Sequence, residues 1–141
     1  QSPAHTDLYL RIRQAMSTTG LVVIAGSNQN RTAYCSLEAL NVLISMQQQG
    51  IEHHVVSLGE PDQYTPNRLS SYEVANLHAQ MIVYAGAIRD VQKAQSVLDS
   101  AKICPVIAII HTNDVVGRFE DMGFSREQIT DIIKIIFLTE D

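Results

Sequence analysis

The stretch Gly20–Ser36, GLVVIAGSNQNRTAYCS, constrains the fold of this chain more than any other segment. Its apolar part, Leu21–Ala25, predicts a buried β-strand, because an unalternating apolar run is typical of a strand that is covered on both faces. The polar residues Gly26–Arg31 predict a loop, and a helix is expected to begin at about Thr32. A strand that leads through a loop into a helix N-terminus can bind phosphates, because free N–H groups and the helix dipole point there.

Strands and helices are expected to alternate along the rest of the chain. Apolar runs predict strands at 21–25, 54–58, 81–85 and 106–110. Helical spacing and capping signals predict helices at 4–18, from 32 to a stop at Gly50, at 70–77, 91–101 and 116–122, and from Ser125 onward, the last lined by Ile129, Ile132, Ile133 and Ile136. The predicted class is α/β, a three-layer parallel sheet in one domain, with an N-terminal helix in 1–19 and a core in 20–137.

The sheet places any ligand site in four loops. Ligands of open parallel sheets bind outside the carboxyl ends of the strands. In this sequence those ends are 26–31, 59–62, 86–90 and 111–114.

The charge balance excludes several classes of partner. The net charge is −5 and the ten Lys and Arg residues are scattered, so neither nucleic acid nor an anionic membrane is an expected partner.

No apolar run reaches the roughly 20 residues that a membrane-spanning helix needs. The first residues lack the pattern of a signal peptide, and we therefore expect a cytoplasmic protein. Cys35 and Cys104 lie far apart and are expected to be free thiols.

Four segments occur in the order of the motifs of a known ATPase family. Gly20–Gly26, Val56–Pro61 (VSLGEP), Ile82–Asp90 (IVYAGAIRD) and His111–Asp114 (HTND) resemble the Walker A strand, Asp box, Walker B segment and His box of the PilT/GspE ATPases. The resemblance touches most of residues 20 to 137. It implies a RecA-like P-loop NTPase fold and a relationship to the hexameric motors of type IV pili and type II secretion.

The phosphate-binding loop departs from that family. A Walker A loop needs glycines to wrap phosphates, a lysine for their charge and a Ser or Thr for Mg²⁺. Gly26 keeps the first glycine, whereas the two further glycine positions carry Gln29 and Arg31. The lysine position carries Thr32 and the hydroxyl position Ala33. Sliding the alignment by one residue places Arg31 and Thr32 at Lys-Ser/Thr, but the loop is then one residue short.

The carboxylates expected from the resemblance are also missing. The Walker B Glu corresponds to Ala87, the Asp box Glu falls on Gly59, and only His111 of the groups that do the chemistry is kept. Such losses remove most of the charge stabilisation of the transition state. The resemblance therefore implies a degenerate pseudo-ATPase with no catalytic residues.

A candidate nucleotide or anion site comprises Gly26, Asn30, Arg31, Thr32 and His111, and the resemblance implies contacts between subunits at Arg89, Asp90 and Asn113. Each has a plainer interpretation. Arg31 can be a solvated loop residue, His111 can be held by hydrogen bonds from Thr112 and Asn113, and Asp90 can cap a helix. No metal site is expected, because the adjacent histidines 53 and 54 would point to opposite faces of a strand.

Three functional hypotheses follow. The first is a non-catalytic relative of the motor domain that binds a motor ATPase or another pilus or secretion component, at the inner-membrane face through such partners, or as a homo-oligomer. The second is a module that senses ATP, ADP, a cyclic dinucleotide or another anion without turnover, and it is the one that needs a nucleotide cofactor. The third is a flavodoxin-like domain with a flavin at Gly26–Thr32.

Overall fold

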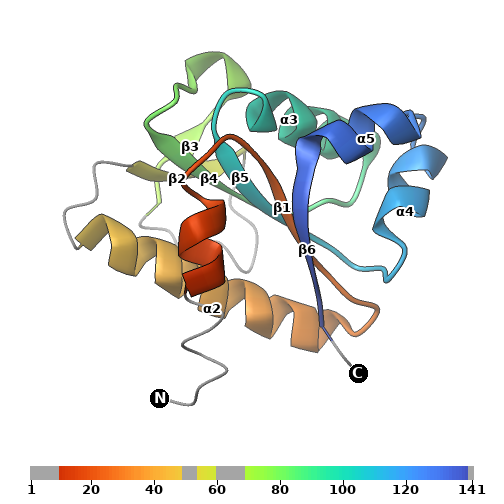
Figure 1. The fold of residues 1–141 in the computed structure, drawn as a ribbon, viewed down its shortest axis with the longest axis horizontal. Coiled ribbons are helices and arrows are strands. Elements are labelled where there is room, and N and C mark those ends of the chain that lie inside the picture. The colour runs from red at the N-terminus through yellow and green to blue at the C-terminus, as the bar shows by residue number, and fades with distance from the viewer. Residues whose placement is uncertain (1–9, 49–53, 60–68, 140–141) are drawn as a thin grey trace.

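The computed structural model describes residues 10–48, 54–59 and 69–139, which form a six-stranded sheet with helices on both faces (Figure 1). The strand order is β3-β2-β4-β5-β1-β6, and every pairing is parallel. The strands are β1 (Gly20–Ala25), β2 (His54–Leu58), β3 (Ser71–Tyr72), β4 (Met81–Ala87), β5 (Pro105–Ile110) and β6 (Ile133–Leu138). The predicted α/β parallel sheet is confirmed.

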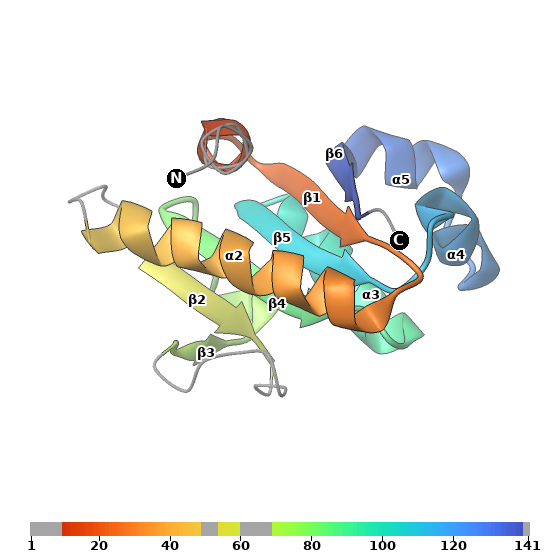
Figure 2. The same cartoon turned by 90° about the horizontal axis from the view of Figure 1, so that it is seen from below.

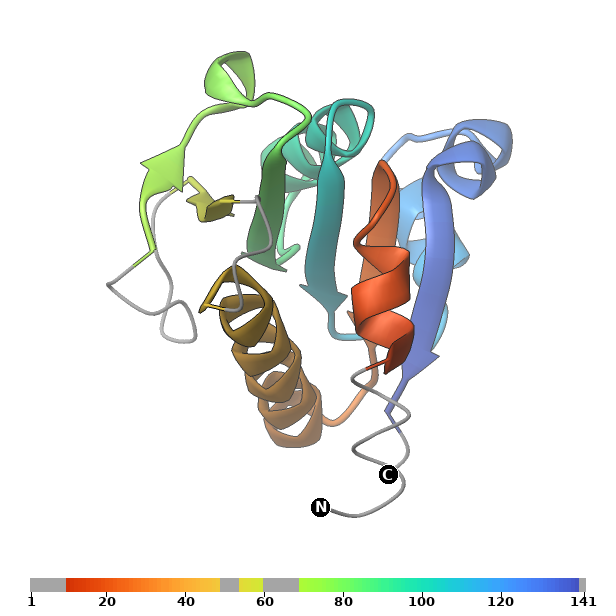
Figure 3. The same cartoon turned by 60° about the vertical axis from the view of Figure 1, so that its left-hand side comes forward.

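Helices enclose the sheet in three layers. They are α2 (Gln29–Gln48), α3 (Val91–Ala101), α4 (Val115–Asp121) and α5 (Arg126–Ile132), with a 3₁₀ turn η1 (Val74–Asn76) and helical residues 10–15. In Figure 2, α2 crosses one face of the sheet and α3 lies behind the other. Figure 3 shows the helical residues 10–15 on the same side as α2, lying over β1 beside β6. Within the described ranges, no helix combines the length and the apolar character needed to cross a membrane.

Strand β1 is buried on both faces, as its unalternating sequence predicts. Leu21 and Val23 pack into a core under α3, α4 and α5, whereas Val22 and Ile24 pack into a second core under α2. All six residues of β1 are buried. The strand is also paired on both edges, with β5 and with β6, so its position is fixed from every side.

The C-terminal segment is where the predicted helix is wrong. Helix α5 ends at Ile132, and the next six residues, IKIIFL, form β6. Ile133 and Ile136, predicted to line a helix, therefore lie in a strand. β-Branched side chains favour strands, and β1 offers an unpaired edge to which this segment adds in parallel. Helical spacing in the sequence did not reveal that edge.

Other boundaries shift by a few residues. Helix α2 begins at Gln29 rather than Thr32, because the side chain of Asn28 accepts a hydrogen bond from the Arg31 N–H at 3.0 Å and caps the helix. Strand β4 extends to Ala87, two residues beyond the predicted end. The helix predicted for 70–77 is instead the short strand β3, paired with β2, followed by η1. The predicted start of the N-terminal helix and the stop at Gly50 lie outside the described residues.

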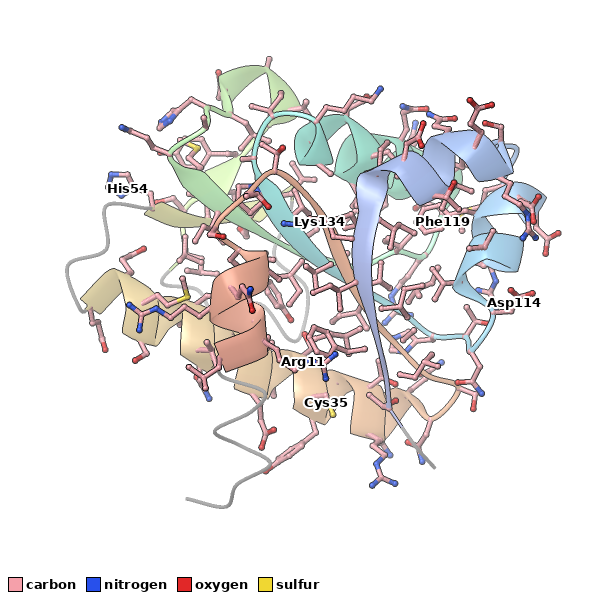
Figure 4. The ribbon with its side chains drawn as sticks, viewed as in Figure 1. Arg11, Cys35, His54, Asp114, Phe119 and Lys134 are labelled. Atoms are coloured by element: carbon pink, nitrogen blue, oxygen red, sulfur yellow. The ribbon has the colours of Figure 1, made fainter. Side chains whose placement is uncertain are left out.

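Lys134 joins β6 to the N-terminal helix. Its ammonium group donates to the carbonyl of Ala15, and to the carbonyl and hydroxyl oxygens of Thr18 at 2.7 and 3.1 Å. On the same face, the guanidinium of Arg11 lies 4.7 Å from the centre of the Phe137 ring (Figure 4 labels Arg11 and Lys134). These contacts hold β6 against the helical residues 10–15 and the turn that follows them.

Replacing Phe137 by alanine tests the assignment of β6. As a strand residue Phe137 packs into the α2-side core, and we expect Phe137→Ala to lower the free energy of unfolding by about 2 kcal/mol, since truncation in a full core costs roughly 3–5. Leu138→Ala is the control, because that side chain is 59% exposed, and it should stay within about 0.5 kcal/mol. Urea unfolding measures both. Equal losses would contradict the strand.

Candidate functional site

The turn between β1 and α2 is much shorter than a phosphate-binding loop. Only residues 26 to 28 separate the end of β1 from the first residue of α2. The N–H of Gly26 donates to the carbonyl of Ile110 at 3.2 Å, which holds the turn against the end of β5. The six-residue loop predicted at Gly26–Arg31 is therefore wrong. Asn30 and Arg31 belong to the first turn of α2, where both are exposed.

Two threonines fill the space beneath this turn. Thr32 is 0% exposed, and its hydroxyl donates to the carbonyl of Asn28 at 2.8 Å. The same hydroxyl lies 3.2 Å from that of Thr139, which follows β6. The N–H of Thr139 donates to the carbonyl of Ala25 at 2.8 Å. Thr32, a predicted anion ligand, is thus committed to contacts within the fold.

Gly26 is required by its neighbours. A Cβ at this position would lie 2.0 Å from the hydroxyl oxygen of Thr139 and 2.8 Å from that of Thr32. The backbone φ of Gly26 is not positive, so its conformation does not require a glycine. The glycine is needed because two side chains approach it closely, and the tight turn alone does not explain it.

Arg31 borders a hollow on the α2 side of the sheet. This hollow of about 340 Å³ is lined by Ile12, Ile24, Arg31, Cys35, Phe137, Leu138 and Thr139. Burial raises the pKa of the Cys35 thiol, and the nearby Arg31 lowers it in part. Within the described ranges, Arg31 forms no ion pair. Its guanidinium is exposed, as the plainer interpretation expects, but it lies on a helix rather than in a loop.

The end of β4 carries a structural cap. The Asp90 side chain accepts a hydrogen bond from the Lys93 N–H at 2.8 Å, which confirms the predicted helix cap. Gly86 has a φ of 72° at an irregularity in the pairing with β5, a conformation that L side chains rarely adopt. Ala87, at the position of the Walker B Glu, is buried in the strand, and Arg89 is exposed.

His111 has buried ring nitrogens at the end of β5. Among the described residues, neither nitrogen has a hydrogen-bond partner, so the predicted hydrogen bonds from Thr112 and Asn113 are wrong. Burial lowers the pKa of His111, and the charges of Arg89 and Arg118 lower it further. These effects favour the neutral form of the imidazole, and the charges of Arg89 and Arg118 act on it from neighbouring segments. Arg118, on α4, was not a predicted site residue, because nothing in the sequence brings it to His111.

The remaining candidate residues have structural or separate positions. Asp114, which Figure 4 labels at the start of α4, accepts a hydrogen bond from the Gly117 N–H at 3.0 Å, and Asn113 before it is exposed. His54 is exposed at the start of β2, and Figure 4 places it far along the sheet from Asp114; His53 lies outside the described residues. Across the described ranges, no three His, Cys, Asp or Glu side chains are grouped in a way that could hold a metal ion.

The loop after β2 is described only at its start. Gly59 has a φ of 77°, and the Lys93 ammonium group donates to the carbonyl of the preceding Leu58 at 2.8 Å. The rest of the predicted Asp box, Glu60 to Asp62, lies outside the described residues.

The predicted anion site therefore separates into two parts. One is the closed turn at Gly26 and Thr32, with Arg31 directed to the hollow beside β6. The other is the end of β5, where His111 lies within electrostatic reach of Arg89 and Arg118. Sequence reasoning missed Thr139, which closes the first part, because the segment before it was predicted to be helical.

Comparison with solved structures places the fold. The ATPase DotB of Yersinia pseudotuberculosis matches with a TM-score of 0.61 and 15% identity, over 97% of this chain and 41% of DotB. The ATPase DotB of Legionella pneumophila matches with a TM-score of 0.58 and 15% identity, over 98% of this chain and 45% of DotB. This chain has the RecA-like ATPase fold. No protein-family model matches the sequence, and no curated protein is significantly similar to it.

These matches bear on the fold implied by the PilT/GspE resemblance. The RecA-like architecture that the resemblance implies is confirmed. The chain spans less than half of the length of either DotB protein. The loss of catalysis, the site residues and the partners stay predictions.

Adding a methyl group at Gly26 tests the closed turn. Gly26→Ala should lower the free energy of unfolding by about 2 kcal/mol, because overpacking a filled site costs roughly 1–3. In a Thr139→Ala background the cost should fall by about half, since the nearest atom is then removed. Chemical unfolding of both single variants and the double variant measures this coupling. Strict additivity would show that Thr139 does not fill the turn.

The pH dependence of His111 tests its environment. The native pKa is expected below the ordinary value of 6.5, so between that lowered pKa and 6.5 the unfolded chain binds more protons than the native one. The His111 contribution to stability is therefore complete above pH 6.5 and declines as the pH falls through this window. NMR titration of the ring measures the pKa. Arg89→Gln should raise it, whereas Lys102→Gln, beyond the far end of α3, should leave it unchanged.

Proposed function

We propose that this chain is a non-catalytic relative of pilus and secretion motor ATPases that acts by binding a protein. The observation that carries the proposal is the closed β1–α2 turn. A fold of this class would place a triphosphate there, against backbone amides, a lysine and a Mg²⁺-binding hydroxyl. Here the turn has three residues and Thr139 lies over Gly26, at a distance that leaves no space for a Cβ. The residues present do not fit a bound nucleotide at this position.

The chemistry of the neighbouring positions supports the same proposal. Ala87 supplies no carboxylate to activate water, and the Thr32 hydroxyl already has partners in the fold. Preorganised charge is usually the largest contribution to catalysis, and this edge of the sheet lacks most of it. The fold is kept while the hydrolytic groups are absent, which is typical of a domain used for its surface.

The proposed partners follow from the resemblance and from the neighbours. DotB is an ATPase of the same fold, and the PilT/GspE family to which the sequence motifs point drives pili and secretion. We expect the partner to be a motor ATPase or another component of such a system. The chain would then work in the cytoplasm, at the inner-membrane face through that partner.

A second function is favoured by His111. Its buried ring nitrogens have no hydrogen-bond partner in the part of the chain that the structure describes, and two guanidinium groups lie near enough to lower its pKa. An anion bound by Arg89 and Arg118 could accept a hydrogen bond from the imidazole N–H. This arrangement supports a sensor that binds an anion or nucleotide without turnover, apart from the closed turn.

A phosphate-release assay distinguishes both proposed functions from ATP hydrolysis. Purified protein with Mg²⁺ and ATP should release phosphate no faster than the buffer, and His111→Ala should not change that rate. Hydrolysis above background that is lost in His111→Ala would contradict the proposal.

Binding without turnover is measured on the same samples. Titration with ATP, ADP and cyclic dinucleotides should give no heat if the chain only binds protein. Heat that disappears in Arg118→Gln, with phosphate release still at background, would favour the sensor instead.

A further inference from the structure

The two edges of the sheet differ in how they are protected. The β3 edge has only two residues, Ser71 and Tyr72, and a short polar edge offers little to a partner strand. The other edge is β6, six residues of which five are apolar. Figure 3 shows these strands on opposite sides of the sheet. Among the described residues, no strand pairs with the outer side of β6.

The first half of β6 is shielded and the second half is not. The pairing with β1 shifts at Lys134, and an irregularity together with a lysine discourages a partner strand there. Beyond it, Val22 to Ala25 pair regularly with Ile135 to Leu138. Two of these side chains are exposed, Ile136 by 37% and Leu138 by 59%. The free part of the edge is therefore the apolar segment Ile135–Leu138.

The backbone direction along this segment follows from one hydrogen bond. The N–H of Thr139 points to β1, where it donates to Ala25. Because alternate residues of a parallel strand bond to opposite sides, Phe137 also faces β1, whereas Ile136 and Leu138 direct their N–H and C=O groups outward. These two residues offer the hydrogen bonds that an added strand would take.

Hollows lie on both sides of the free edge, and their charge indicates what fits. The hollow on the α2 side, described above, contains Arg31 beside Phe137 and Leu138. On the α5 side, a hollow of about 270 Å³ is lined by Val116, Thr130, Ile133, Lys134 and Ile136. Both are largely apolar, and among the described residues neither is lined by Asp or Glu. Arg31 lines the first, whereas the ammonium group of Lys134, which borders the second, donates to Ala15 and Thr18. Side chains of an added strand would enter both, since they alternate between faces.

We propose that Ile135–Leu138 is a docking strand that pairs with an extended segment of a partner protein carrying alternating apolar and acidic side chains. Its carboxylates lie on the α2 side, where they meet Arg31, and its apolar side chains fill the hollow on the α5 side. A second copy of β6 fits poorly, because IKIIFL brings a like charge at Lys134 and no carboxylate. The inference rests on the proposed protein-binding function and assigns it a surface.

The probes are a fluorescein-labelled octapeptide of alternating valine and glutamate, and its valine–lysine counterpart. Fluorescence anisotropy with the unmodified full-length chain should show binding of the glutamate peptide and no binding of the lysine peptide. Ile136→Pro removes one outward N–H and spares the pairing with β1, so the fold should persist by circular dichroism, as proline is tolerated at a sheet edge. Affinity should fall by about tenfold, the effect of losing one or two hydrogen bonds.

Charge reversal provides the second arm. Arg31→Glu should weaken binding of the glutamate peptide and permit that of the lysine peptide, whereas Lys102→Glu, just beyond α3, should change neither. Equal binding of the two peptides by the unmodified chain, or unchanged affinity in a folded Ile136→Pro variant, would overturn the docking strand. If sedimentation shows a dimer that Ile136→Pro dissociates and neither peptide binds, the occupant is a second copy and the proposal is wrong.

The docking strand and the proposed function can fail separately. A native partner that still co-purifies with Ile136→Pro would leave the protein-binding function standing and place its surface elsewhere. ATP hydrolysis by the chain would contradict the proposed function whatever the peptides do.

Discussion

The pairing of β6 with β1 determines most of what is distinctive in this molecule. It completes the cover of β1, which is then bonded on both edges and packed on both faces. It also brings Thr139 to the carbonyl of Ala25 at 2.8 Å, directly over Gly26. In a P-loop protein the end of this strand faces a phosphate. In this chain it faces Thr139. The closure at this turn is therefore a consequence of sheet pairing as well as of loop sequence.

This closure is the reason for proposing that the chain does not hydrolyse ATP. The parallel sheet directs its strand ends to one edge, where a nucleotide would be held by converging loops. In this chain one of those ends is packed by two threonines, and another carries a histidine whose pKa two arginines help to lower. The two groups do not form one continuous cradle for a triphosphate. The edge of β6 and its two hollows face outward, and we propose that this surface contacts a protein.

Much of the fold could be predicted from the sequence because its signals are local. The run Leu21–Ala25 indicated burial on both faces, and Asp90 indicated a cap for α3. The segment Ile133–Leu138 could not be assigned this way, since isoleucines at helical spacing also suit a strand, and the choice depends on the free edge of β1 over a hundred residues earlier. The same long-range pairing hid Thr139, and the packing of α4 hid Arg118. The candidate site was thus predictable as a set of loops but not as a set of contacts.

The central claim is that the β1–α2 turn is closed to nucleotide. The most direct measurement is an NMR titration that follows the amide signals of Gly26, Thr32 and Thr139 while Mg²⁺ and ATP are added to millimolar concentration. If the turn is closed, all three amide signals keep their positions, including under conditions in which the signals of the His111 ring shift. Saturable shifts of the Gly26 and Thr32 amides, with loss of the Thr139 contact, would contradict it.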